Sequence, residues 1–264
     1  MNLRYKTSVA SEKGIREINE DFYLVIEHKK DTLIVLCDGV GSEEGSEIAA
    51  LTTIKIFEKY FKRRIYWFFN FFKFYNFCIR KTIKTLKRIS YKNKNIATTL
   101  CVAYIHGKKI SCANLGDSRI FFFSNKQKEW KQISHDHNLL NQIMDKYEAQ
   151  RIKKPEFENI INQKENDEIE YNKNHLSYLT KCIEPWKKIL PNDSFYQTID
   201  NVNDNDMILV ATDGLYNFIE NNLINSLIEK TKFSAISKEL TDIALKNGSN
   251  DNITSILLKF GNGK

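Results

Sequence analysis

The clearest pattern along this chain is a pair of apolar runs that each end in Asp-Gly. Leu33–Cys37 leads into Asp38-Gly39, and Met207–Thr212 leads into Asp213-Gly214. A continuous apolar run that stops at an acid–glycine turn predicts a buried strand with a carboxylate at its end. Asp-Gly alone is a common turn dipeptide. The prediction of a shared site therefore depends on whether further acids converge on the same place.

Shorter patterned segments predict the remaining elements. Apolar runs bounded by polar turns predict strands at 3–10, 22–27, 97–105, 110–115, 118–124 and 253–260. Helical periodicity predicts a helix after Asp38, one near 138–150 capped by Ser134 or Asp136, and two more at 222–229 and 235–246. The chain therefore combines antiparallel strands with helices in separate blocks.

An aromatic block, residues 62–77, follows the first predicted helix. It reads KRRIYWFFNFFKFYNF, too short and too polar to span a membrane. Aromatic residues beside basic ones also suit a membrane surface, so contact through 62–77 stays open as an alternative. We favour a helix pair that covers one face of a sheet with an aromatic core and continues to Ile89.

Composition indicates one domain. The chain has 264 residues, 42% of them hydrophobic, with only three prolines and ten glycines, and no repeat or low-complexity tract. We expect a single domain over residues 1–264. Residues 151–174 are charged and poor in pattern, which predicts a surface flap there.

Charge and cysteine usage narrow the function classes. The formal charge is +7, but the lysines are spread along the chain without a nucleic-acid recognition motif, so we expect no nucleic acid partner. A basic surface favours acidic, phosphorylated partners. The five cysteines form no CxxC pair, and the first residues lack the apolar core of a signal peptide. We expect a reduced, cytoplasmic protein.

Five acids form a candidate constellation. Asp38, Asp213 and Asp251 lie at the ends of predicted buried strands, while Glu20 and Asp117 lie in neighbouring loops. The histidines show no metal-binding spacing, and oxygen-only clusters select hard cations such as Mg²⁺ or Mn²⁺. Two carboxylates about 5 Å apart repel by roughly 3 kcal/mol at an effective dielectric of 20. Such a cluster must bind a cation or take up protons.

The order of short motifs resembles one family. The series is Arg16-x-x-Asn19-Glu20-Asp21, Asp38-Gly39-x-Gly41, Thr98-Thr99, Gly116-Asp117-Ser118-Arg119, Asp136-His137, Asp213-Gly214 and Asp251-Asn252. It resembles the metal-dependent protein serine/threonine phosphatases (PPM family, type 2C), in the small form typical of bacteria. The resemblance runs from Arg16 to the last predicted strand.

That resemblance implies a fold and a metal centre. The fold would be a mixed α/β (α+β) four-layer α-β-β-α sandwich, two antiparallel sheets flanked by helix pairs. Asp38 would bridge two Mn²⁺ or Mg²⁺ ions, with the Gly39 carbonyl, Asp213 and Asp251 as further ligands and Glu20 acting through water. Asp117 would help to hold a third, weaker ion.

The resemblance also implies chemistry and partners. Water activated by two ions would attack phosphoserine or phosphothreonine in proteins, with Arg16, Asp38, Asp213 and Asp251 as the catalytic set. Arg16 would clamp the phosphate. A cognate serine/threonine kinase is implied as a functional counterpart, and we expect a monomer.

The sequence departs from the family pattern at three positions. Val40 replaces a histidine that serves as leaving-group acid in many eukaryotic members, so that role has no candidate here. Ser42 and Ala97 replace glycines. Two other function classes stay open: a catalytically weak module that binds phosphoproteins, and a membrane-surface interaction protein that uses 62–77.

Overall fold

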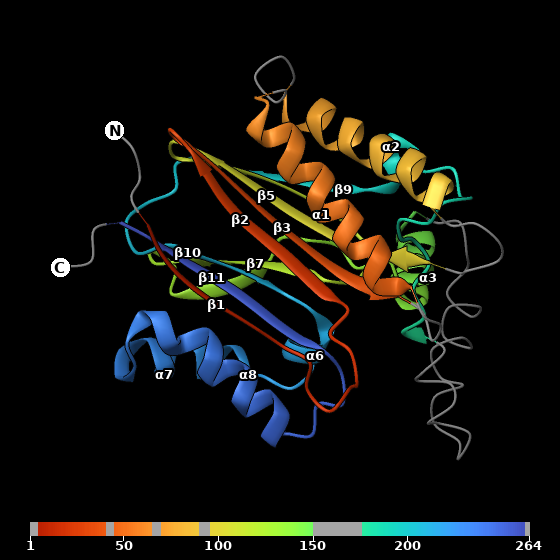
Figure 1. Cartoon of the computed structure of the whole chain (residues 1–264). Coiled ribbons are helices and arrows are strands. Elements are labelled where there is room, and N and C mark those ends of the chain that lie inside the picture. The colour runs from red at the N-terminus through yellow and green to blue at the C-terminus, as the bar shows by residue number, and fades with distance from the viewer. Residues whose placement is uncertain (1–4, 41–44, 65–69, 90–95, 150–175, 262–264) are drawn as a thin grey trace.

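The computed structural model describes residues 5–40, 45–64, 70–89, 96–149 and 176–261. The predicted flap at 151–174 lies outside these residues. In the described part, two antiparallel sheets stack face to face and helices cover both outer faces (Figure 1). The predicted α-β-β-α sandwich is confirmed.

The first sheet contains both terminal strands. Its order is β1 (Tyr5–Glu12), β11 (Ile253–Phe260), β10 (Met207–Ala211), β7 (Arg119–Ser124) and β8 (Glu129–Gln132). The second sheet has the order β2 (Asp21–His28), β3 (Asp31–Val40), β5 (Leu100–His106), β6 (Lys109–Leu115) and β9 (Phe195–Ile199). The two-residue strand β4 (Ala97–Thr98) pairs with the end of β3.

Two groups of helices flank the sheets. The second sheet is covered by α1 (Ser46–Lys62) and α2 (Phe71–Ile89), and the first by α6 (Asp213–Tyr216), α7 (Asn221–Lys230) and α8 (Ile236–Lys246) (Figure 1). Helix α3 (Leu139–Glu148) and the short 3-10 helices η2 (Pro191–Asp193) and η3 (Phe233–Ala235) complete the described elements.

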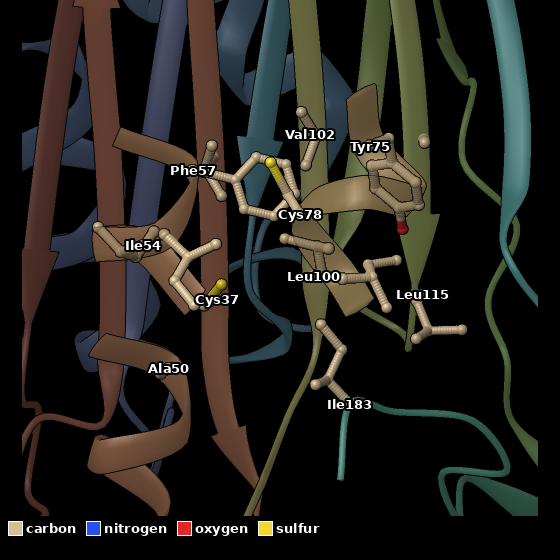
Figure 2. Close-up of a cluster of buried hydrophobic side chains, with 14 of the residues drawn as sticks. Cys37, Ala50, Ile54, Phe57, Tyr75, Cys78, Leu100, Val102, Leu115 and Ile183 are labelled. Atoms are coloured by element: carbon tan, nitrogen blue, oxygen red, sulfur yellow. The ribbon is translucent and has the colours of Figure 1, made fainter. Parts of the chain in front are cut away.

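Three apolar cores hold the four layers together. One lies between α1, α2 and the second sheet and includes Phe57, Tyr75 and Leu100, all fully buried (Figure 2). A second lies between the sheets, and a third between the first sheet and α7 and α8. Burial of apolar side chains on this scale is the main term that stabilises a domain.

The aromatic block contributes to the first of these cores. Phe74 and Tyr75 are buried, and Phe71 and Phe77 pack against the same cluster, whereas Phe72 is 40% exposed. For the described residues 70–77, the expected aromatic core of a helix pair is therefore confirmed. Residues 65–69 lie outside the described part.

Some expectations about single elements were wrong. Asn138 caps α3, because its side chain accepts from Asn141 N. Ser134 instead accepts from Ile120 N, and Asp136 pairs with Arg119. The strand predicted over 97–105 is interrupted at Thr99, whose side chain turns to the backbone of Asp38.

Candidate metal and phosphate site

Asp38 lies near the end of β3, where the neighbouring chain fixes its backbone from one side. Asp38 N donates to Thr99 Oγ1 at 3.0 Å, and Asp38 O accepts from Thr99 N at 2.8 Å and from Thr98 Oγ1 at 2.9 Å. These bonds replace a regular strand ladder at this point. They hold the Asp38 backbone in a fixed position, so its side chain projects from a rigid base.

Asp21 is the cross-strand partner of Asp38 and is almost fully buried. Its Oδ2 accepts from Thr212 Oγ1 at 2.9 Å and from Thr254 Oγ1 at 2.7 Å. Its Oδ1 is buried and has no hydrogen-bond partner in the described part of the chain. Burial, followed by the charges of Asp213 and Asp251, raises the pKa of Asp21 to about 7. The two hydroxyl hydrogen bonds connect Asp21, in the second sheet, to the first sheet beside Asp38.

Glu20 and Gly39 lie side by side at the same rim. Gly39 N donates to Glu20 O at 3.1 Å, and a Glu20 carboxylate oxygen accepts from Ser46 Oγ at the start of α1. A Cβ at position 39 would lie 2.9 Å from Ser46 O, so this turn requires glycine. The helix α1 and the Asp38-Gly39 turn therefore fix each other.

Asp213 and Asp251 come together through their glycine and asparagine neighbours. A Cβ at Gly214 would lie 2.1 Å from Asn252 O, so glycine permits α6 to touch the loop before β11. Asn252 Oδ1 accepts from Glu20 N at 2.9 Å, which connects this loop to β2. Burial, and after it the charge of Asp251, raises the pKa of Asp213.

Arg16 lies on the rim of this cluster and reaches Asp251. Its Nη2 contacts Asp251 Oδ2 at 3.0 Å, and its Nε donates to Asn250 O at 2.9 Å. Both side chains of the pair are substantially exposed, at 52% for Arg16 and 38% for Asp251. The expected arginine is thus beside the acids, with its guanidinium bonded to one of them.

Asp117 approaches the cluster from the turn between β6 and β7. Burial, together with the charge of Asp213, raises its pKa to about 7. Tyr216 of α6 donates to Asp117 O at 3.1 Å, and the Arg119 guanidinium lies 3.8 Å from the Tyr216 ring centroid. Asp136 holds Arg119 through two oxygens at 2.6 to 3.2 Å.

Several supporting residues were not assigned their observed role from the sequence. Thr99, Arg119 and Asp136 stood in the quoted motifs, but only their geometry reveals what they hold. Tyr216 and Ser46 carried no motif signal beyond their positions shortly after Asp213 and Asp38. A polar residue one helical turn after a candidate acid was the available clue for Tyr216.

The electrostatics of Asp38 identify the centre of the cluster. Burial raises its pKa well above the usual value, and the charges of Asp21, Asp213, Asp117 and Asp251 raise it further. Four acids from separate chain segments therefore act on Asp38. Their donors are all oxygen, the chemistry that suits Mg²⁺ or Mn²⁺.

The oxygen donors of these residues suit a divalent cation, but their side chains are not arranged to coordinate one directly. Within the described residues, no three Asp, Glu, His or Cys side chains are placed so that they would hold a metal ion directly. Asp251 Oδ2 accepts from Arg16, and a Glu20 oxygen accepts from Ser46. Coordination through those oxygens requires the two side chains to exchange partners.

A separate cavity of about 720 Å³ lies at the other end of the second sheet. Its lining includes Phe71, Tyr104, His106 and Tyr196, and none of the predicted site residues. This cavity gathers aromatic side chains around a single acid, Asp31, and lacks the group of carboxylates found at the rim beside Asp38.

Relatives in sequence are known from two mycoplasmas. A candidate protein phosphatase of Mycoplasma genitalium is 27% identical, covering 98% of this chain and 96% of the relative. A candidate protein phosphatase of Mycoplasma pneumoniae is 30% identical, covering 95% of this chain and 94% of the relative. This chain therefore matches both relatives over almost their whole length.

Solved structures share the fold at lower identity. The serine/threonine phosphatase of S. agalactiae superposes with a TM-score of 0.74 at 21% identity, covering 97% of this chain and 99% of that one. The catalytic domain of the serine threonine protein phosphatase PstP, solved in complex with two manganese ions, gives 0.71 at 17% identity, covering 99% and 100%. In the described part of this chain, no helix is both long and apolar enough to cross a bilayer.

The family profile of protein phosphatase 2C matches residues 16–258. That range contains every residue of the acidic cluster and all the strands except β1 and the last residues of β11. The chain belongs to the protein phosphatase 2C family.

Proposed function

We propose that this chain hydrolyses phosphoserine and phosphothreonine in proteins and that it requires Mn²⁺ or Mg²⁺. The observation that carries the proposal is the convergence of Asp21, Asp117, Asp213 and Asp251 on Asp38. Phosphoryl transfer at such a rim requires positive charge to offset both the acids and the phosphate.

Different residues of this chain would hold the ions and orient the strands that carry the acids. Asp38, Asp213 and Asp251, with the Gly39 carbonyl and Glu20 through water, would hold two ions, and Asp117 a third. Bound there, the ions would supply Lewis acidity and a nucleophilic water at neutral pH. Asp21 and the hydroxyls of Thr212 and Thr254 would orient the acid-bearing strands.

Arg16 would bind the phosphoryl oxygens. Its guanidinium already lies beside Asp251, is half exposed and offers several parallel N–H donors. Two such donors on phosphate neutralise charge that develops in the transition state. Arg16 would then exchange its bond with Asp251 for one with substrate, while Asp251 turns to metal.

The partners follow from the same reaction. A serine/threonine kinase would supply the phosphoproteins, and we propose a monomer that works in a reducing, cytoplasmic environment. All five cysteines are free, and four of them are buried. Size-exclusion chromatography with light scattering tests the monomer, because a dimer would double the 31.0 kDa mass.

The direct test is phosphate release from a phosphothreonine peptide. Wild type should release phosphate with Mn²⁺ and lose activity with a chelator, and Asp38→Asn should lose at least 10²-fold in kcat. Asp242→Asn, an exposed acid on α8 that pairs with Lys238, is the matched control and should keep full activity. Metal-dependent turnover by Asp38→Asn at the wild-type rate would refute the assignment.

A further inference from the structure

Helix α2 presents a strongly basic face to solvent. It carries six basic residues and no acidic one: Lys73, Arg80, Lys81, Lys84, Lys87 and Arg88. All of these except the half-buried Lys81 are exposed. At 100° per residue, the five exposed cations fall within about 100° of the helix circumference. Within the described residues, none of those five forms an ion pair.

At its C-terminal end, this basic face meets an exposed tryptophan. Lys87 Nζ lies 5.8 Å from the ring centroid of Trp186, and Trp186 is 70% exposed. Exposed apolar and basic residues surround the contact. We define the basic–aromatic patch as Lys84, Lys87, Arg88, Ile89, Trp186, Lys187 and Lys188.

A basic helix face by itself is usually only solvated. The tryptophan adds an exposed aromatic face beside these cations, and tryptophan and arginine are enriched among the residues that contribute most to protein binding. Ile89, at 50% exposed, adds apolar surface to the same patch. Glu184, which pairs with Lys187 at 3.0 Å, reduces the positive charge only locally.

Backbone hydrogen bonds connect the patch to β3, the strand that carries Asp38. Thr98 N donates to Ile183 O at 3.0 Å, and Ile183 N donates to Thr98 O at 2.8 Å. Thr98 in turn is the register partner of Gly39. Trp186 is three residues beyond Ile183, which places it within about 11 Å of that residue.

The course of α2 agrees with this placement. The helix runs toward the end of the molecule at which α1 begins (Figure 1), and α1 begins at Ser46 beside Glu20 and Gly39. An extended peptide of about six residues spans roughly 20 Å. A substrate whose phosphate lies at Asp38 can therefore place a neighbouring segment on the patch.

We propose that the basic–aromatic patch docks an acidic segment of the phosphoprotein substrates, four to eight residues from the phosphorylated side chain. This inference rests on the proposed phosphatase function and adds a substrate preference to it. Unpaired cations on a protein surface complement Asp and Glu and accelerate encounter through long-range attraction. Trp186 adds a face for an apolar side chain of the same segment.

The kinetic test compares two phosphothreonine peptides that differ only in flanking charge. One carries Glu runs four to eight residues from the phosphothreonine on both sides, and the other carries Gln at those positions. We expect wild type to prefer the acidic peptide by about tenfold in kcat/KM, through KM, and 0.5 M salt to remove the preference. The rate with p-nitrophenyl phosphate should not depend on the patch.

The variants separate the patch from general surface charge. Lys84→Gln/Lys87→Gln/Arg88→Gln should cleave the two peptides equally well, with kcat unchanged. Lys59→Gln/Arg63→Gln/Lys73→Gln removes the same charge at the other end of α1 and α2 and should keep the preference. Trp186→Ala should lower kcat/KM for the acidic peptide by about threefold. Melting temperatures establish that each variant folds.

A binding measurement keeps the docking inference independent of turnover. Fluorescence anisotropy of a labelled Glu-rich peptide without phosphate should show weaker binding to the patch variant than to wild type. Equal binding, or equal kcat/KM for the two peptides in wild type, would overturn the docking while phosphate release still supported the enzyme. Loss of anionic-vesicle binding in the patch variant, without any peptide preference, would assign the patch to lipid instead.

Discussion

The guanidinium of Arg16 contacts Asp251 in this structure, and the same group is proposed to hold the substrate phosphate. One residue would therefore bind two partners in succession, Asp251 in this structure and phosphate in the proposed complex. A surface arginine at this position would ordinarily pair with a sequence neighbour such as Glu17 or Glu20. The observed partner is Asp251, 235 positions away, which a local reading of the sequence cannot supply.

Arg16→Ala should lower kcat/KM by about 10²-fold and leave Mn²⁺-induced stabilisation intact, because the arginine is assigned to phosphate and not to metal. Arg16→Lys should recover only part, since an ammonium cannot reproduce the bidentate fork. Asp251→Asn is the contrast and should weaken metal binding first. If Arg16→Ala lost metal binding as severely as Asp251→Asn, the clamp would be wrong. Peptide kinetics and thermal melts across a Mn²⁺ titration make the comparison.

His137 offers a test of stability against pH. Its Nδ1 accepts from Gly116 N at 3.1 Å, and burial lowers the pKa of His137 to about 4. The unfolded chain takes up a proton near pH 6.5 and the folded one only near 4, so stability falls as pH decreases from 6.5 to 4. The loss attributable to His137 should be about 3 kcal/mol at pH 4.

Urea unfolding at several pH values measures this, with His137→Gln as the comparison. Glutamine keeps an acceptor for Gly116 N but does not titrate. The difference in unfolding free energy between the two proteins should shrink toward low pH. If the difference in unfolding free energy stayed constant from pH 7 to 4, His137 would not be a source of the pH dependence.

Among the elements, the strands were predicted best because their apolar runs are continuous. The last strand, expected at 253–260, has those bounds in the structure, and the Met207 strand differs by one residue. Strands β8 and β9 were not predicted, because neither contains a continuous apolar run: β8 has one buried residue, Trp130, and β9 has none. Helix α6 is a single turn and has no periodicity that a sequence could reveal.

Glycine 214 tests the contact between α6 and the loop before β11. Gly214→Ala should cost about 1–3 kcal/mol of stability, because the added Cβ would overlap Asn252 O. It should also reduce activity strongly, since Asp213 and Asp251 flank the contact. Urea unfolding and peptide kinetics supply the two readouts.

Gly107→Ala is the matched control. Gly107 has φ +56° in the β5–β6 hairpin, with no atom within 4 Å of an added Cβ. Alanine there should cost about 1 kcal/mol through backbone strain alone and leave turnover unchanged. Equal activity losses in the two variants would show that the Gly214 contact has no special role at the site.

For the molecule as a whole, the motif order was sufficient to predict the family and the four layers, and both predictions are confirmed. The site assignments stay predictions. Sequence order indicated which acids would meet, but not that Ser46 and Arg16 already bond to Glu20 and Asp251. Those bonds depend on side-chain rotamers, which no sequence pattern encodes.

Mutual repulsion among the acids predicts stabilisation by metal. At a concentration 100 times Kd, Mn²⁺ should stabilise the fold by about 2.7 kcal/mol. In a chain of this size, that should raise Tm by about 5–10 °C. Asp38→Asn should show little shift, and the exposed-acid variant Asp242→Asn the full shift. A wild-type Tm that does not respond to Mn²⁺ at activating concentrations would contradict an acidic metal centre.

The position of β11 has a consequence for how the protein is made. This last strand lies between β1 and β10, and in the described sheet β1 pairs with no other strand. During synthesis, β1 is made before the other described strands and has no strand partner until β11 has left the ribosome. Synthesis at 5–20 residues per second makes that delay on the order of 10–50 s. Asp251 arrives with the same segment, so the proposed metal site cannot be complete before the first sheet closes.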